Sequence, residues 1–131
     1  MMVPSEPVTE VVHKPGVRIL LVEDHEPTRT VLVQLLTRRQ YKVATAGSVA
    51  EARLLAEQDT FDLVLSDIGL PDGSGYALMA ELRDRFGLRG IALTGYGMEE
   101  DVARAKVAGF VAHLTKPVRM ESLEKALYAA K

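Results

Sequence analysis

The sequence predicts one α/β domain in which a parallel β-sheet is covered by helices on both faces. Five short apolar runs of the kind that form strands alternate with five segments whose apolar residues recur at helical spacing. The joins between them are short, which favours parallel strands connected through helices. The chain has 131 residues, of which 47% are hydrophobic and 26% charged, so it can bury a core of its own.

The five strands are predicted from short runs rich in aliphatic and β-branched residues. They are expected at residues 17–23, 41–46, 61–66, 90–94 and 110–115. The third run, FDLVLS, is apolar at its centre and is followed directly by the acid Asp67. This run is therefore expected to be the central, fully buried strand.

The five helices are predicted from helical spacing and from residues that start and end helices. They are expected at residues 27–39, from Ser48 to before the third strand, and at residues 73–86, 98–108 and 120–130. Pro27 suits a first turn, and Ser48 with Glu51 has capping-box spacing. Gly87 and Gly109 follow two of the helices as terminating glycines. The helix at 73–86 is expected to bury one face, formed by Leu78, Met79, Leu82 and Phe86.

Residues 1–16 are expected to be a flexible tail or linker, and residues 17–131 the folded domain. The first segment, MMVPSEPVTEVVHKPG, contains several prolines and lacks the apolar centre of a signal peptide. A remnant of an interdomain linker and a simple terminal tail fit this composition equally well.

The composition argues against several classes of partner. A formal net charge of −2 gives no basic excess for direct nucleic-acid binding. The apolar run at residues 19–22 is far shorter than the roughly 18 residues of a membrane span, so no membrane contact is expected. The chain has no cysteine, which excludes disulfides and thiolate metal sites and is compatible with the cytoplasm, where we expect the domain.

Polar side chains stand at the ends of four predicted strands. They are Glu23 and Asp24 after the first strand, Asp67 after the third, Thr94 at the end of the fourth and Lys116 after the fifth. The carboxyl ends of parallel strands meet at one edge of a sheet, where ligands of such folds bind. Three carboxylates, one hydroxyl and one ammonium group are therefore expected to meet there.

This set of groups suits a phosphoryl group bound with a divalent cation. Neighbouring carboxylates repel one another, and Mg²⁺ removes that penalty because it prefers oxygen ligands. Thr94 and Lys116 would add a neutral donor and a positive charge, so reaction would depend on positioning and charge neutralisation. Asp67 is the best candidate for the phosphoryl acceptor, because Gly69 and Gly73 leave its approach open and a carboxylate can form an acyl phosphate.

Four motifs together resemble the receiver domain of two-component response regulators. They are LLVEDH, LVLSDIGLPDGSG, IALTGYG and HLTKPV, and they occur in this order at the predicted strand ends. The resemblance covers residues 17–131 and implies a flavodoxin-like (βα)5 three-layer sandwich with strand order 2-1-3-4-5. It implies that Asp67 takes a phosphoryl group from the phosphohistidine of a histidine kinase or a histidine phosphotransfer domain. Such a domain promotes its own phosphorylation and dephosphorylation and has no kinase ATP site.

The resemblance also implies roles for individual residues, with Mg²⁺ or Mn²⁺ as the cofactor. The implied metal ligands are Asp24, Asp67, the backbone carbonyl of Gly69 and, through water, Glu23. Thr94 would bond the phosphoryl oxygens, and Lys116 would pair with them. The peptide bond between Lys116 and Pro117 is expected to be cis.

The sequence departs from the family pattern near the switch residues. His113 stands three positions before Lys116, where the family usually has an aromatic switch residue that moves together with the threonine, here Thr94. A polar switch and an ordinary packed histidine both remain open for His113. Gly69 and Tyr96, each two positions after a site residue, are expected to tune dephosphorylation.

Two further polar residues near the site have simpler interpretations. Asp72 is expected to shape the turn in the PDG sequence rather than to bind metal. His25 is expected to be a solvated residue at the start of a helix.

Two other functions fit part of this pattern. A small phosphatase of the haloacid-dehalogenase type also uses an aspartyl nucleophile, but it needs a second acid two positions later, where this chain has Gly69. A degenerate receiver would act as a binding module without phosphorylation, and the complete set of acids argues against it.

Three kinds of parent protein could contain this domain. A stand-alone regulator, a regulator cut before its DNA-binding domain and the receiver of a hybrid sensor histidine kinase all fit, and the AHLTKPV ending with the proline-bearing upstream segment favours the last. Output is expected through the face formed by the fourth helix, fifth strand and fifth helix, where a homodimer is one option.

Overall fold

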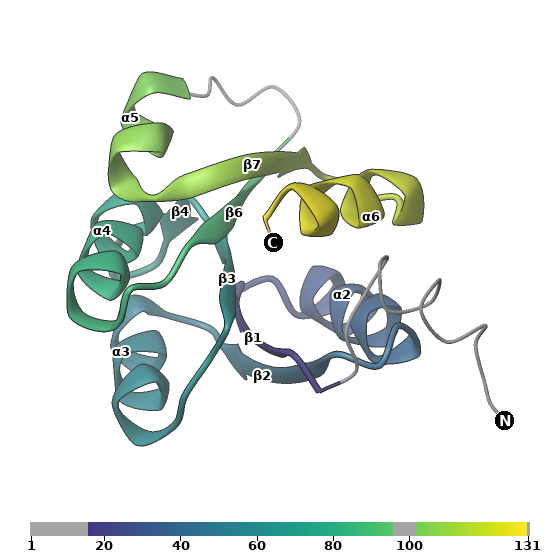
Figure 1. Ribbon diagram of the computed structural model, residues 1–131, viewed down its shortest axis with the longest axis horizontal. Coiled ribbons are helices and arrows are strands. Elements are labelled where there is room, and N and C mark those ends of the chain that lie inside the picture. The colour runs from purple at the N-terminus through teal and green to yellow at the C-terminus, as the bar shows by residue number, and fades with distance from the viewer. Residues whose placement is uncertain (1–15, 96–101, 131) are drawn as a thin grey trace, which may run out of the picture.

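The middle layer of the fold is a five-stranded parallel sheet, seen in the computed structural model, which describes residues 16–95 and 102–130 (Figure 1). Its strands are β1 (Arg18–Val22), β2 (Lys42–Ala46), β3 (Leu63–Asp67), β6 (Gly90–Thr94) and β7 (Phe110–Thr115). They are ordered β2-β1-β3-β6-β7, and every pair is parallel. Counted along the chain, the main strands follow the order 2-1-3-4-5, so the predicted flavodoxin-like fold is confirmed.

Helices cover both faces of this sheet (Figure 1). They are α2 (Glu26–Arg38), α3 (Val49–Gln58), α4 (Gly75–Phe86), α5 (Val102–Ala108) and α6 (Met120–Ala129). Helices α2 and α6 lie on one face, and α3, α4 and α5 lie on the other. The predicted tail up to Pro15 and the predicted start of a helix at Met98 lie outside the described residues.

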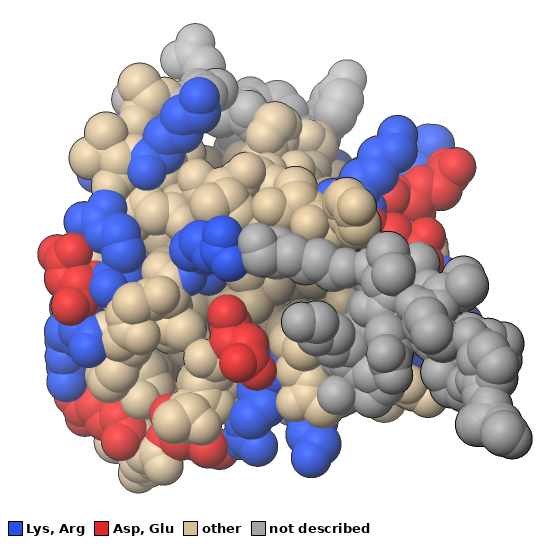
Figure 2. All heavy atoms as spheres, viewed as in Figure 1, with Lys and Arg blue, Asp and Glu red and all other residues tan. Residues whose placement is uncertain are grey.

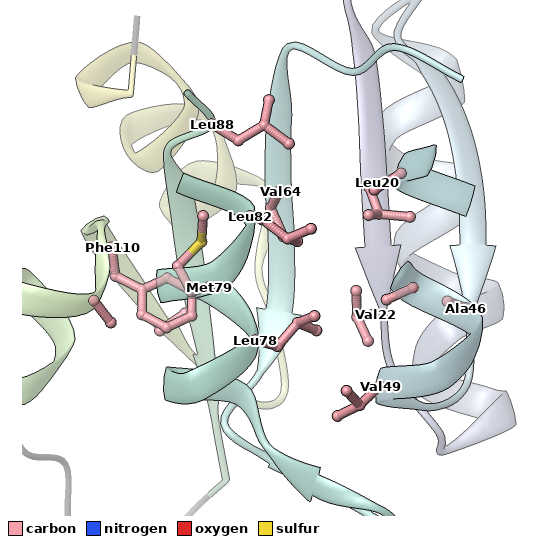
Figure 3. Packing of buried hydrophobic residues seen from close by; sticks show 14 of the residues in the cluster. Leu20, Val22, Ala46, Val49, Val64, Leu78, Met79, Leu82, Leu88 and Phe110 are labelled. Carbon is pink, nitrogen blue, oxygen red and sulfur yellow. The ribbon is translucent and has the colours of Figure 1, made fainter. Parts of the chain in front are cut away.

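Each face of the sheet carries its own apolar core, because successive side chains of a strand point to opposite faces. In β1, Leu20 and Val22 pack under α3 and α4, whereas Ile19 and Leu21 pack under α2 and α6. Figure 3 shows the first core, in which side chains of α4 and Phe110 of β7 meet the strand residues. Burial on both faces explains why β1 and β3 are continuous apolar runs rather than alternating ones.

The predicted helix ends are largely confirmed. Ser48 caps α3 by accepting a hydrogen bond from the Glu51 backbone N–H at 3.1 Å, and Glu51 Oε1 accepts one from the Gly47 N–H at 2.7 Å. The first bond satisfies an N–H group that the helix start leaves without a partner, and the second fixes the residue before the cap. Gly87 ends α4 with a φ of 71°, a conformation that glycine adopts without strain.

The segment between β3 and α4 differs from the prediction. Helix α4 begins at Gly75 rather than at residue 73, with Ser74 as its cap. Ahead of it, β4 (Gly69–Leu70) and β5 (Gly73–Ser74) form a short antiparallel pair that the sequence pattern did not indicate. Two-residue strands are too short to produce a period in the sequence, so only the folded chain reveals them.

The prediction that Phe86 shares the buried face of α4 is wrong. Leu78, Met79 and Leu82 are buried as expected, but Phe86 is 40% exposed, and the Arg85 guanidinium lies 4.9 Å from its ring centroid. The chain turns back at Gly87, and Leu88 enters the core in place of Phe86.

Ion pairs join the outer surfaces of α3 and α4. Arg53 of α3 pairs with Glu81, and Arg85 of α4 pairs with both Glu57 and Glu81. Acidic and basic side chains accordingly alternate along this edge of the molecule in Figure 2. Exposed pairs of this kind contribute at most about 1 kcal/mol each, so the core under the two helices dominates their packing. None of the helices in the described ranges has the length and hydropathy that crossing a membrane requires.

Candidate functional site

Three carboxylates meet at the carboxyl edge of the sheet. Glu23 and Asp24 follow β1, and Asp67 is the last residue of β3, the strand next to β1. One oxygen from each carboxylate lies within 4.8 Å of the others. Glu23 is fully buried and Asp67 is 7% exposed, whereas Asp24 is exposed, so the cluster opens to solvent on the side of Asp24.

One ammonium group lies among these acids. The Lys116 Nζ, from the loop after β7, is 2.9 Å from Asp67 Oδ2 and 2.5 Å from Glu23 Oε1. The peptide bond between Lys116 and Pro117 is cis. Three carboxylates and one ammonium leave a formal charge of −2, so the site holds more negative charge than its own cation can balance.

The surroundings of these groups shift two pKa values. Burial raises the pKa of Glu23 above its ordinary value, although hydrogen bonds from Lys116 and from the His25 backbone oppose the rise. Burial alone would lower the pKa of Lys116, but the hydrogen bonds and charges of Glu23 and Asp67 outweigh it and raise that pKa. The lysine therefore stays charged, and the ionised form of Glu23 is the one that the site destabilises.

Thr94 ends β6 beside this cluster and is 3% exposed. Its hydroxyl donates a hydrogen bond to the carbonyl of Leu114 in β7 at 3.3 Å, and its own carbonyl accepts one from the Lys116 N–H at 2.8 Å. The hydroxyl thus faces β7 rather than Asp67. It would have to leave Leu114 before it could bond a group attached to Asp67.

The family model of the response regulator receiver domain matches residues 19–128 of this chain. The chain belongs to that family. It is 39% identical over 110 residues to the two-component response regulator ORR24 of Oryza sativa subsp. indica, a match that covers 82% of this chain and 18% of that relative. The receiver domain thus spans about a fifth of the relative's length.

Solved structures of other receiver domains share this fold. The signal receiver domain of an HD domain-containing protein from Pseudomonas fluorescens Pf-5 is 31% identical, with a TM-score of 0.81, covering 88% of this chain and 94% of that one. The receiver domain of the Saccharomyces cerevisiae response regulator Ssk1, co-crystallised with the histidine phosphotransfer protein Ypd1, is 27% identical. Its TM-score is 0.73, and the match covers 85% of this chain and 86% of that one.

Of the remaining predicted residues, Gly69 adjoins Asp67 and His113 shares a cavity with Thr94. The Gly69 N–H donates to Asp67 Oδ1 at 3.3 Å, and no atom of residues 16–95 and 102–130, apart from its chain neighbours, lies within 4 Å of the place where a Cβ would stand. His113 is exposed on β7 and lines a cavity of about 120 Å³ that also borders Thr94. This placement leaves both interpretations of His113 open. Tyr96 lies outside the described residues.

Arg29, which was not predicted as a site residue, holds the loop that carries two of the acids. Its Nη1 donates a hydrogen bond to the Glu23 carbonyl at 2.9 Å from the second turn of α2. The Glu23 N–H donates to the Ala46 carbonyl at 2.9 Å, so this backbone is bonded on both sides. A basic residue shortly after a pair of acids is the signal that could have indicated this contact.

Asp72 and His25 lie outside the carboxylate cluster, as predicted. His25 is the exposed N-cap position of α2, and its ring bonds the Thr28 hydroxyl at 2.7 Å. The prediction that Asp72 serves its own turn was incomplete. Its carboxylate accepts hydrogen bonds from the backbone N–H groups of Val49 and Ala50, at the start of α3.

Replacing Glu23 by glutamine is expected to flatten the pH dependence of stability in the metal-free protein. Burial raises the Glu23 pKa above 4.5, so the folded domain keeps this proton at pH values where the unfolded chain has lost it. The free energy of unfolding should therefore fall as the pH rises from about 4.5 through the folded-state pKa. Urea unfolding with a chelator, from about pH 4 to about pH 8, measures this slope.

The matched control for this substitution is Glu26→Gln, which removes an exposed carboxylate from the first turn of α2. It should keep the wild-type slope between the same pH limits. An unchanged slope in Glu23→Gln would show that burial does not raise the pKa of Glu23 in the folded domain.

Proposed function

We propose that this receiver domain accepts a phosphoryl group on Asp67 from a phosphohistidine and thereby switches a signalling output. The observation that carries the proposal is the position of Asp67 at the end of the central strand, mostly buried, with Lys116 Nζ 2.9 Å away and two further acids within 4.8 Å. Membership of the receiver family supports it, and so does the likeness to a receiver co-crystallised with a histidine phosphotransfer protein.

A divalent cation, Mg²⁺ or Mn²⁺, fits the oxygen atoms at this site. The three carboxylates and Lys116 carry a formal charge of −2, which favours a cation, and carboxylate oxygens are the ligands that Mg²⁺ prefers. Asp24, Asp67 and the Gly69 carbonyl would hold the cation, with Glu23 acting through water. When bound, the cation supplies charge neutralisation for the phosphoryl oxygens.

The chain's own groups then carry out the transfer. A carboxylate oxygen of Asp67 forms a bond to phosphorus while the P–N bond of the phosphohistidine breaks, and the electron pair of that bond returns to the imidazole. Lys116 exchanges its contact with Asp67 for a phosphoryl oxygen. Thr94 gives up its bond to Leu114 and donates to another phosphoryl oxygen. This movement of Thr94 would carry the signal to β7.

Incubation with acetyl phosphate and Mg²⁺, followed by intact mass measurement, tests the proposal. A stable gain of one phosphoryl group supports the receiver function. Turnover of many phosphoesters would instead indicate a phosphatase of the haloacid-dehalogenase type, although the second acid of that class is absent at Gly69. No reaction at all would indicate a degenerate receiver that acts as a binding module.

Two alanine substitutions should separate metal binding from phosphoryl binding. Asp24→Ala is expected to weaken Mg²⁺ binding by about tenfold or more, because it removes the exposed carboxylate ligand. Lys116→Ala should keep or strengthen Mg²⁺ binding, because it removes the only cation paired with Glu23 and Asp67 in the described residues, but it should slow phosphorylation. Calorimetric Mg²⁺ titration and the rate of mass gain measure the two effects. Unchanged Mg²⁺ affinity in Asp24→Ala would refute the ligand assignment.

The partner and the setting follow from the same proposal. The donor is a histidine kinase or a histidine phosphotransfer domain, and the domain, residues 17–131, works in the cytoplasm. Output runs through the face formed by α5, β7 and α6, where Val107 and Val111 are exposed by 74% and 43%. An output partner or a second copy of the chain would cover these side chains.

A further inference from the structure

Asp72 joins the loop after the phosphoacceptor to a helix far away in the sequence. It lies in the turn between β4 and β5, and its two carboxylate oxygens accept hydrogen bonds from the N–H groups of Val49 at 2.7 Å and Ala50 at 3.0 Å. These are the first two residues of α3, whose N–H groups have no partner within their own helix. These bonds lower the pKa of Asp72, and the bond from the Val49 N–H has the largest effect.

The other bonds at this helix start are local to α3. Ser48 accepts from the Glu51 N–H, and Glu51 accepts from the Gly47 N–H. Among the described hydrogen bonds at this end of α3, those of Asp72 are the ones that cross to the acceptor loop. The loop also approaches this helix start closely at Gly73, since a Cβ built there would lie 3.3 Å from the Val49 side chain.

The loop tied down by Asp72 is the one that carries Gly69, a proposed cation ligand. The base of this loop is closed by the Gly75 N–H, which donates to the Ile68 carbonyl at 2.9 Å. Beside Gly69 the described part of the chain leaves open space, because none of its atoms lies within 4 Å of a Cβ built there. The Gly69 backbone is held by its own bond to Asp67 and by the packing of its neighbours Ile68 and Leu70. The β4–β5 pair and the bonds that Asp72 accepts fix the rest of the loop.

We propose that Asp72 is a positioning residue that holds the Gly69 loop against α3 and thereby sets the affinity of the site for a divalent cation. This inference rests on the proposed function, since it takes the Gly69 carbonyl as a cation ligand. Coupling between two sites is reciprocal. Cation binding should therefore strengthen the bonds that Asp72 accepts from Val49 and Ala50.

Mg²⁺ titration of Asp72→Ala, Asp72→Asn and Ser48→Ala tests this role, at a temperature at which circular dichroism shows all of them folded. Ser48→Ala is the matched control, because it removes a cap from the same end of α3 without touching the acceptor loop. Asp72→Ala is expected to weaken Mg²⁺ binding by about threefold to tenfold, and Asp72→Asn by less because the amide oxygen can still accept. Ser48→Ala should bind Mg²⁺ like the wild type.

Amide hydrogen exchange gives a second readout that does not depend on phosphorylation. The Val49 and Ala50 amides should exchange more slowly when Mg²⁺ is added to the wild type, and this protection should disappear in Asp72→Ala. Equal Mg²⁺ affinity in Asp72→Ala and Ser48→Ala would overturn the inference while leaving the proposed function intact. Failure of the wild type to bind Mg²⁺ would overturn the proposed function, and the inference with it.

Discussion

Asp67→Asn is expected to abolish phosphoryl uptake while the fold stays intact. An amide oxygen is a poor nucleophile because its electrons are delocalised into the C–N bond, so asparagine cannot form the acyl phosphate that a carboxylate forms. Every other group of the site would still be present. The mass gain of one phosphoryl group after incubation with acetyl phosphate and Mg²⁺ should therefore be lost completely.

The stability of Asp67→Asn should change little. The substitution removes one ion pair with Lys116, but it also removes the repulsion between Asp67 and the acids Glu23 and Asp24. These effects oppose each other, and the change in the free energy of unfolding is expected to stay within about 1 kcal/mol. Thermal and urea unfolding without metal measure it.

Asp62→Asn provides the control for Asp67→Asn. Asp62 also accepts a backbone hydrogen bond, from the Arg18 N–H at 2.8 Å, but this bond lies at the start of β1, at the other end of the sheet from the acids. This variant should take up the phosphoryl group like the wild type. Wild-type labelling of Asp67→Asn would mean that another carboxylate, with Asp24 the first candidate, is the acceptor.

Gly75→Ala is expected to have the largest effect on stability. A Cβ at this position would overlap the carbonyl oxygen of Asp67 and lie 2.7 Å from the Cα of Ile68. Both neighbours are backbone atoms at the end of β3, so they cannot move aside as a flexible side chain does. The free energy of unfolding should fall by about 3 kcal/mol or more, which corresponds to a decrease in Tm of roughly 10 °C.

This substitution should also impair the site, because the overlap falls on the backbone of the proposed acceptor. Either α4 or the end of β3 must shift, and Asp67 moves with the strand end. Mg²⁺ affinity and the rate of phosphoryl uptake are therefore expected to fall together in the fraction that folds. Differential scanning calorimetry and Mg²⁺ titration on the same samples would record both losses.

Gly69→Ala is the matched glycine control for stability. The added Cβ there meets no atom of the described residues within 4 Å, so the free energy of unfolding should change by about 0.5 kcal/mol or less. A Gly75→Ala protein as stable as Gly69→Ala would show that the close approach of α4 to the strand end is not required.

The order of elements could be predicted because local patterns encode it. The strands at 90–94 and 110–115 were predicted with their observed ends, since β6 and β7 are short apolar runs flanked by turn residues. The position of Asp67 at the end of a buried run follows from the same kind of pattern. Parallel pairing then places the groups that follow these strands at one edge, whatever the details of the loops.

Contacts between loops were decided by the tertiary structure. Lys116 lies 49 residues from Asp67 in the chain, and its 2.9 Å contact depends on the course of the loop after β7. Two further contacts could not be predicted from local sequence patterns. They are the bonds that Asp72 accepts from Val49 and Ala50, and the bond that Arg29 donates to the Glu23 carbonyl. The exposure of Phe86 depends on where Leu88 packs after the turn.

The sequence by itself thus determined the fold class, the strand order expected from the resemblance, and the set of groups at the carboxyl edge. Hydrophobic periodicity and strand-end residues carry that information within short windows of the chain. Only the tertiary structure decided which oxygen pairs with which nitrogen, that the Thr94 hydroxyl bonds Leu114, and that Asp72 anchors the acceptor loop. Such contacts depend on register and on loop geometry, which arise from the packing of the whole chain.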